Sequence, residues 1–472
     1  MEDAGIADEL DGMNLGDQRL NRRSRRILTA LAANCEASIN GSMDGWADTQ
    51  AAYRFFRNEQ VTPEQILAPH VEATERRVSE QATVLVLQDT TSFNFSAHPA
   101  RDQRCLCEPT QLGFYQHVNL AVTTDRLPLG VLSAECFDRA AESFEKTSPK
   151  PRRTPEVIES KESFRWLKGF RLCCELAKRH PETRIVSVAD READIYDIFL
   201  EAKQMRGSIP NVHYVLRAHE DRSTPERDLS ASRRTYHKVR DQVQQSPVRT
   251  RHVVDLCGTS QRSARTATLD VRAITVTVKP PNARNDLPPI THNVILVQEC
   301  CPPESDTPVE WLLLTTLPIE TAEGLLRVID HYAARWTIEV YFRTLKTGCR
   351  VEQMQLETKS RQLNCLAFYN IIAWRILSLT GLNRTCPHVS CTSVFADHEW
   401  KPLWRVATKQ PLPKTPPTLT TFVQLLAQLG GYNNRRQERP PGPQPLWIGV
   451  RRMLDYSTAW LTFGPDADTR CV

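Results

Sequence analysis

The stretches ATVLVLQD, residues 82–89, and RIVSVAD, residues 184–190, decide the fold class. Each is a run of mainly apolar, often β-branched residues, which is typical of a strand buried on both faces, and each stops at an aspartate. We therefore predict that Asp89 and Asp190 lie at the C-terminal ends of two central strands. Functional groups in open α/β sheets gather beyond those ends, so we expect the two carboxylates to be neighbours.

Asp190 also has a purely structural alternative. A helical pattern, IYDIFLEAK, follows it, and aspartate is a preferred N-cap residue. The same alternative does not apply to Asp89, because the residues after it, TTSFNF, do not begin a helix.

A third set of polar residues lies in DHYAARWTIEVYFRTLKTG, residues 330–348, which reads as one helix. On a continuous helix its residues Tyr332, Arg335, Glu339 and Lys346 would fall within an arc of roughly 60°. A carboxylate binds a hard divalent cation, and the other three side chains can bind phosphate oxygens, which together suits phosphoryl transfer on nucleic acid. A solvated, charged helix face is the alternative.

These motifs belong to a longer series. QDTTS around Asp89, ADREADIY around Asp190 and the Y-R-E-K spacing resemble the DDE transposases of the insertion-sequence-four family, which includes the transposase of transposon five. Further matching segments follow in the family's order: AYRFFRN from Ala52, KESFRWL from Lys161, YVLRAH from Tyr214, EWLLLTTLP from Glu310 and LRVIDHYAARW from Leu326. Each motif alone is weakly specific, but the ordered series along most of the chain is a strong resemblance.

The resemblance implies a catalytic site and a reaction. Asp89, Asp190 and Glu339 would be the catalytic residues and would hold two divalent cations, Mg²⁺ or in its place Mn²⁺, on either side of the scissile phosphate. The implied activity is cut-and-paste transposition by metal-dependent cleavage and strand transfer. The transposon end is nicked, forms a hairpin, is reopened and is joined to target DNA.

The resemblance also implies contacts with DNA. Trp311 matches the family's tryptophan that stacks on a flipped base, with core packing in a strand as the alternative. Tyr332, Arg335 and Lys346 match residues that hold the phosphates beside this base. Arg217 matches a further backbone contact.

The order of predicted elements, antiparallel strands followed by alternating helices and strands, is that of ribonuclease-H-like cores. Strand patterns at about residues 221–320, including TYHKVRDQV, predict an inserted β-subdomain. A proline-rich linker is predicted at residues 147–156. We thus expect a mixed α/β chain with a helical DNA-binding domain, a catalytic core and a C-terminal helical dimerisation domain, at residues 1–78, 79–380 and 381–472.

The N-terminal segment, from Asp17 to about Glu75, is predicted to be helical with one basic and one apolar face. The arginines predicted to contact DNA are Arg19, Arg22, Arg23, Arg26, Arg54 and Arg57. Clustered arginines favour contact with phosphates, and in the family this region recognises the transposon end. A merely solvent-exposed basic helix is the alternative.

The C-terminal segment contains an apolar stripe and resembles the family's dimerisation segment. The stripe consists of Leu446, Trp447, Val450 and Leu454. Ordinary core packing is the alternative for each of these residues.

The composition is that of an ordinary globular protein, with 472 residues, 40% hydrophobic and 25% charged residues and a net charge of +4. The 14 cysteines form no CxxC pair, and no signal peptide is recognised at the acidic N-terminus. This favours a reducing cytoplasm and a chain without a zinc site. The resemblance implies a bacterial, nucleoid-associated protein. The longest apolar stretches, such as WLLLTTLPI from Trp311, fall short of a membrane span.

Two other functions remain open. A ribonuclease-H-like nuclease without strand transfer would need the same acids, but neither an end-recognition module nor a dimerisation segment. A non-catalytic DNA-end-binding regulator, or an inactive copy, would not need the acids at all. The expected partners of a transposase are double-stranded DNA, as inverted-repeat ends and as target, and a second copy of the chain in the synaptic complex.

Overall fold

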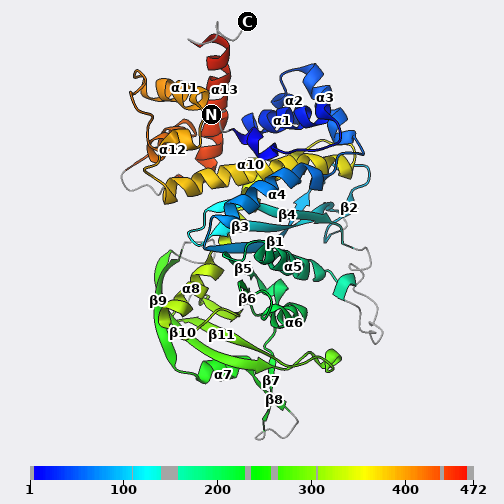
Figure 1. The fold of residues 1–472 in the computed structure, drawn as a ribbon, viewed down its shortest axis with the longest axis vertical. Helices are drawn as coiled ribbons and strands as arrows, with labels where there is room; N and C mark the ends of the chain where they lie inside the picture. The colour runs from blue at the N-terminus through cyan, green and yellow to red at the C-terminus, as the bar shows by residue number, and fades with distance from the viewer. Residues whose placement is uncertain are drawn as a thin grey trace. The chain divides into compact units, whose positions relative to one another are not determined.

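The computed structural model describes residues 5–108, 110–139, 158–228, 235–256, 264–303, 307–435 and 441–464. The chain forms two compact units (Figure 1). The first unit comprises Met1–Arg77, Thr90–Ser148 and Thr337–Val472, and the second comprises Val78–Asp89 and Pro149–Trp336. The predicted linker at residues 147–156 lies outside the described residues, and the three-domain division stays a prediction.

The second unit is built on a mixed sheet with the strand order β1-β5-β6-β12-β11-β10-β9. The strands are β1 (Thr83–Asn94), β5 (Arg184–Ala189), β6 (Val212–Arg217), β9 (Val248–Leu256), β10 (Arg265–Val278), β11 (Ile290–Glu299) and β12 (Glu310–Thr315). Strands β1, β5 and β6 are parallel, and the remaining neighbours are antiparallel. The mixed α/β class predicted from the sequence is therefore correct.

The helices of this unit fill the connections between its strands. They are η3 (Ile158–Ser160), α5 (Phe164–Arg179), η4 (Arg191–Ala193), α6 (Tyr196–Met205), α7 (Val239–Gln245), η5 (Asn282–Arg284) and α8 (Ala322–Ala333), and a separate hairpin pairs β7 (Ser223–Asp228) with β8 (Thr235–Lys238). The strands expected in the 221–320 region are present, with one correction. TYHKVRDQV is not one strand, because α7 begins at Val239, and Val239 and Val243 are buried one helical turn apart.

Burial explains why the apolar runs form central strands. In β5, every residue from Ile185 to Ala189 is buried, as is every residue of β1 from Val84 to Gln88. By contrast, β10 largely alternates buried and more exposed residues, as expected for a strand covered on one face.

The first unit is mainly helical. Its strands β2 (Arg104–Cys105) and β4 (Pro128–Phe137) both pair with β3 (Leu112–Thr123). Its N-terminal helices are η1 (Ile6–Leu10), α1 (Gln18–Ala33), α2 (Ile39–Ser42), α3 (Trp46–Arg57) and α4 (Pro63–Ser79). The later helices are α9 (Trp336–Arg343), η6 (Thr344–Gly348), η7 (Val351–Gln353), α10 (Lys359–Thr385), η8 (Cys391–Ser393), α11 (Asp397–Thr408), α12 (Leu419–Leu429) and α13 (Pro443–Phe463).

Helix α10, the long yellow helix in Figure 1, is the core helix of the first unit. In length and composition it could cross a membrane, with a mean hydropathy of 1.4, a stretch that the sequence analysis overlooked. However, 83% of this apolar window is buried inside the unit. Its apolar residues therefore face neighbouring protein, as in the core helix of a globular domain.

Two buried histidines make the stability of the second unit depend on pH. His292 and His331 are each 3% exposed, and burial lowers the pKa of each to about 4. Both are therefore neutral when folded but take up protons below about pH 6.5 when unfolded. Their contribution to stability is present above that pH and is lost as the pH falls toward about 4.

Lowering the pH from about 7.5 to about 5 is therefore expected to cost about 2 kcal/mol of folding stability per histidine. The urea midpoint of the full chain at the two pH values measures this loss. The double substitution His292→Gln, His331→Gln should show a clearly smaller shift between the two conditions. An unchanged shift in the double variant would contradict the assignment.

Candidate active site and DNA-contacting surfaces

The two strand-end aspartates lie side by side in the second unit. Strand β1 pairs with β5 from Thr83↔Arg184 to Gln88↔Ala189, and Asp89 and Asp190 are the next residues along the two chain segments. The expected strand end at Asp89 is wrong, because β1 continues to Asn94. The residues that follow Asp89 include threonines and a phenylalanine, which favour an extended strand. Asp89 therefore lies within β1, beside the point where the neighbouring strand β5 ends.

One guanidinium faces both carboxylates. Arg335 Nη1 donates to Asp89 Oδ2 at 2.8 Å, and Nη2 lies 3.7 Å from Asp190 Oδ2. The Arg335 side chain is 7% exposed, whereas those of Asp89 and Asp190 are 19% and 32% exposed. A cation at this position offsets the repulsion between two carboxylates that share one site. The arrangement is therefore a partly open, acidic site that attracts positive charge.

Arg335 reaches the aspartates because the helix predicted at residues 330–348 is broken, which is a correction. Helix α8 ends at Ala333, α9 begins at Trp336, and η6 is a π-helical turn. The amide of Arg335 donates to the carbonyl of Tyr332 at 3.0 Å, the three-residue spacing of a turn. The prediction of one continuous helix is therefore wrong, and the shared face of the four side chains stays a prediction. No glycine or proline marks the break, which instead accompanies burial of the Arg335 guanidinium.

Tyr332 and Trp311 form the aromatic side of the site. The Tyr332 hydroxyl donates to Asp190 Oδ1 at 3.4 Å, and its ring packs edge-on against Trp311 with centroids 5.4 Å apart. Burial, with the nearby charge of Asp190, raises the pKa of Tyr332, so the hydroxyl remains a proton donor at neutral pH. Trp311 lies on β12 and is only partly buried. Its packing against Tyr332 is observed, while its stacking on a base stays a prediction.

Arg217 is the last residue of β6, which pairs with β12, the strand that contains Trp311. It pairs in register with Leu313, and its Nη2 donates to the carbonyl of Glu310 at 3.3 Å. Its charge also acts on Tyr332, where it opposes the rise in pKa. The second unit thus brings together Asp89, Asp190, Tyr332, Arg335, Trp311 and Arg217.

The structural alternative for Asp190 is also observed. Its Oδ1 accepts a hydrogen bond from the amide of Arg191 at 2.7 Å and caps the short helix η4. Its Oδ2 is the oxygen that faces Arg335. Because each oxygen has a different partner, the cap orients the carboxylate and leaves its second oxygen directed at a cation.

Glu339 and Lys346 belong to the first unit. Glu339 lies in the first turn of α9, and Lys346 lies in η6 with Nζ 5.7 Å from the centre of the Phe93 ring. Burial lowers the pKa of Lys346, opposed by the charges of Glu352 and Glu339. Within the described part of each unit, no group of three or more His, Cys, Asp or Glu side chains could hold a metal. The three-carboxylate metal site therefore stays a prediction, of which the structure describes the two-aspartate part.

The predicted basic face of α1 is partly neutralised within the chain. Arg23 and Arg26 pair with the two carboxylate oxygens of Asp48 at 2.8 Å and 2.9 Å. Arg19 and Arg22 are exposed. Asp48 lies on another helix, α3, and nothing in its local sequence indicates this pairing. Of the four arginines, Arg19 and Arg22 are those the structure leaves most available to phosphates.

Helix α3 buries two phenylalanines and exposes its two arginines. Arg54 and Arg57 are exposed. Phe55 and Phe56 are buried, and both rings pack against Phe368 of α10. The aromatic residues thus anchor the helix, and the arginines face solvent, where they can contact phosphates.

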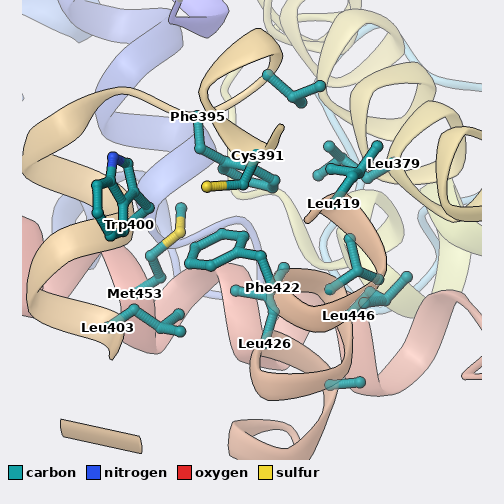
Figure 2. Close-up of a cluster of buried hydrophobic side chains, with 13 residues drawn as sticks. Leu379, Cys391, Phe395, Trp400, Leu403, Leu419, Phe422, Leu426, Leu446 and Met453 are labelled. Atoms are coloured by element: carbon teal, nitrogen blue, oxygen red, sulfur yellow. The ribbon is translucent and has the colours of Figure 1, made fainter. Parts of the chain in front are cut away.

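The predicted apolar stripe of α13 contributes to a core within the chain (Figure 2). Leu446 belongs to a buried cluster with residues of α11 and α12, and Val450 and Leu454 pack against that cluster. Trp447 is buried and donates its indole N–H to Glu36 at 2.7 Å. The core-packing alternative is therefore observed for this stripe.

Comparison with known protein families identifies the two ends of the chain. Residues 3–61 match the family model described as transposase DNA-binding, and residues 371–459 match the transposase Tn5 dimerisation domain. Both matches are transposase domains, in the order expected from the sequence. The class is thus that of a DNA-binding, dimer-forming transposase. These two matches support the resemblance to transposon-five-like transposases of the insertion-sequence-four family.

Proposed function

We propose that this chain catalyses cut-and-paste transposition through a ribonuclease-H-like DDE core. The steps would be nicking at the transposon ends, hairpin formation and opening, and strand transfer into target DNA. The observation that carries the proposal is the pair Asp89 and Asp190, which directly follow the last paired residues of two parallel strands and face the guanidinium of Arg335. The two transposase domains that flank this site support the same function.

The donors of this site suit a hard divalent cation. Asp89 and Asp190 offer carboxylate oxygens, which Mg²⁺ and Mn²⁺ prefer, and both side chains remain partly open to solvent. We propose Glu339 as the third ligand of a pair of such ions. When bound, they would stabilise charge on the attacking and leaving oxygens of the scissile phosphate.

Four further side chains would hold the DNA. Tyr332 keeps its proton and can donate to a phosphate oxygen, and Arg217 and Lys346 can supply positive charge. Trp311, packed against Tyr332, is the candidate for stacking on a base displaced from the hairpin. Arg335 would orient the carboxylates of Asp89 and Asp190, which it contacts at 2.8 Å and 3.7 Å.

The flanking domains would supply the partners. Arg19, Arg22, Arg54 and Arg57 are exposed in or near the matched DNA-binding region and are candidates to hold the inverted-repeat end, with Arg23 and Arg26 beside them. Two copies of the chain would join two ends in a synaptic complex through the matched dimerisation region. We place this activity on the nucleoid of the bacterial cytoplasm.

Incubation of the purified protein with Mg²⁺ and a linear DNA tests the proposal. The DNA carries the inverted repeats that flank the reading frame, and the control carries scrambled repeats. We expect hairpin-ended products from the first DNA only. Mg²⁺-dependent cuts without preference for the repeats would favour the nuclease, and end binding without cleavage would favour the regulator or inactive copy.

A further inference from the structure

Asp194 ends the short turn that Asp190 begins. Helix η4 has Asp190 as its N-cap and Asp194 as its C-cap. The side chain of Asp194 is completely buried, which for a carboxylate requires nearly full hydrogen bonding. None of the roles described above uses this residue.

Asp194 satisfies that requirement with one distant loop. Its Oδ2 accepts the amide hydrogens of His219 at 2.8 Å and Glu220 at 3.0 Å. Its Oδ1 accepts from Nε and Nη2 of Arg222 at 3.1 Å and 2.5 Å, and Nη2 also donates to the Asp194 carbonyl at 2.8 Å. The carboxylate thus fixes both the backbone of residues 219–220 and the guanidinium that follows.

Arg222 is held on its other side by an aromatic ring. Its guanidinium carbon lies 5.2 Å from the centre of the Phe199 ring, and its side chain is 12% exposed. A charge-assisted pair in which two guanidinium N–H groups donate to one carboxylate oxygen, and in which the guanidinium also packs on an aromatic ring, has little freedom to shift. The turn after Asp190 and the loop at residues 219–222 therefore behave as one rigid piece.

This rigid piece connects two residues of the candidate site. Strand β6 ends at Arg217, two residues before the first amide that Asp194 binds, and η4 starts at Asp190. We propose that Asp194 and Arg222 are a positioning pair that sets Asp190 relative to Arg217, and thereby the metal affinity of the carboxylate. The proposal rests on the proposed function in one respect, because that function makes Asp190 a metal ligand and Arg217 a DNA contact.

Replacing Asp194 with asparagine keeps its volume but removes the charge that pairs with Arg222. We expect Asp194→Asn to speed hydrogen–deuterium exchange at the amides of residues 219 and 220. We also expect it to weaken Mn²⁺ binding, followed by electron paramagnetic resonance on the full chain, by about 10-fold or more. Binding to the transposon-end DNA should stay within about twofold, because the matched DNA-binding region is untouched.

Asp197→Asn is the matched control. Asp197, on α6, pairs with Arg284 at 2.6 Å and is 16% exposed, so its substitution also breaks a partly buried ion pair of the same unit. This control should leave Mn²⁺ binding and exchange at residues 219–220 unchanged. If Asp194→Asn does not fold, Arg222→Lys, which keeps the charge but loses the fork, should show the same changes to a smaller extent.

Several results would overturn the inference. They are equal Mn²⁺ affinities of the Asp194→Asn and Asp197→Asn chains, an Arg222→Lys chain that matches the wild type in both readouts, and a wild-type chain that binds no Mn²⁺. A wild-type chain that binds Mn²⁺ more tightly than the Asp194→Asn chain but cleaves no DNA would reject the proposed function and leave the positioning role intact.

Discussion

Replacing either strand-end aspartate with asparagine, Asp89→Asn or Asp190→Asn, is expected to lower DNA cleavage by about 10³-fold or more, or about 4 kcal/mol of transition-state stabilisation. The substitution keeps the size of the side chain but removes a charge that a divalent cation needs. Arg335 retains the other aspartate as a partner, so the fold should persist. Single-turnover cleavage of end DNA with saturating Mg²⁺ measures the effect.

The control for this prediction is binding, because the matched DNA-binding region does not include the aspartates. Affinity of both variants for the transposon-end DNA, measured by gel shift without metal, should equal that of the wild type. Cleavage by Asp89→Asn at more than about a tenth of the wild-type rate would remove Asp89 from the metal site. Equal losses of binding and cleavage would indicate misfolding.

Removing the guanidinium between the aspartates has the second large effect. Arg335→Gln leaves Asp89 and Asp190 facing each other without a cation, and their mutual repulsion then opposes folding. Because both carboxylates are partly exposed, we expect a loss of about 2 kcal/mol, less than for a fully buried pair. Mg²⁺ should restore stability by replacing the lost positive charge, so the Tm of the variant should rise more with Mg²⁺ than that of the wild type.

Arg327→Gln is the comparison for this substitution. Arg327, on α8, pairs with Glu323 at 3.0 Å, and both side chains are well exposed, so its loss should cost little and should not respond to Mg²⁺. If Mg²⁺ raises the Tm of Arg335→Gln and of the wild type equally, the carboxylates do not form a cation site.

Some features of the candidate site could be predicted because their signals are local. The buried runs that lead to Asp89 and Asp190 indicate central strands, and the parallel register of these runs brings the two aspartates together. The amphipathic pattern of α1 likewise indicates a helix with Ile27 and Leu31 buried and the arginines outside. In each case the residues that form the apolar pattern and the residues that become buried belong to the same helix or strand.

Other features could not be read from any one segment. The break between α8 and α9 has no glycine or proline to announce it, and it accompanies contacts of Arg335 with residues on two distant strands. Asp48 limits the basic face of α1 from another helix. The sequence therefore determined which strands form and which acids they deliver, because periodic burial is a local property. Only the tertiary structure decided which charges meet, because ion pairs join residues whose spacing in the chain carries no signal.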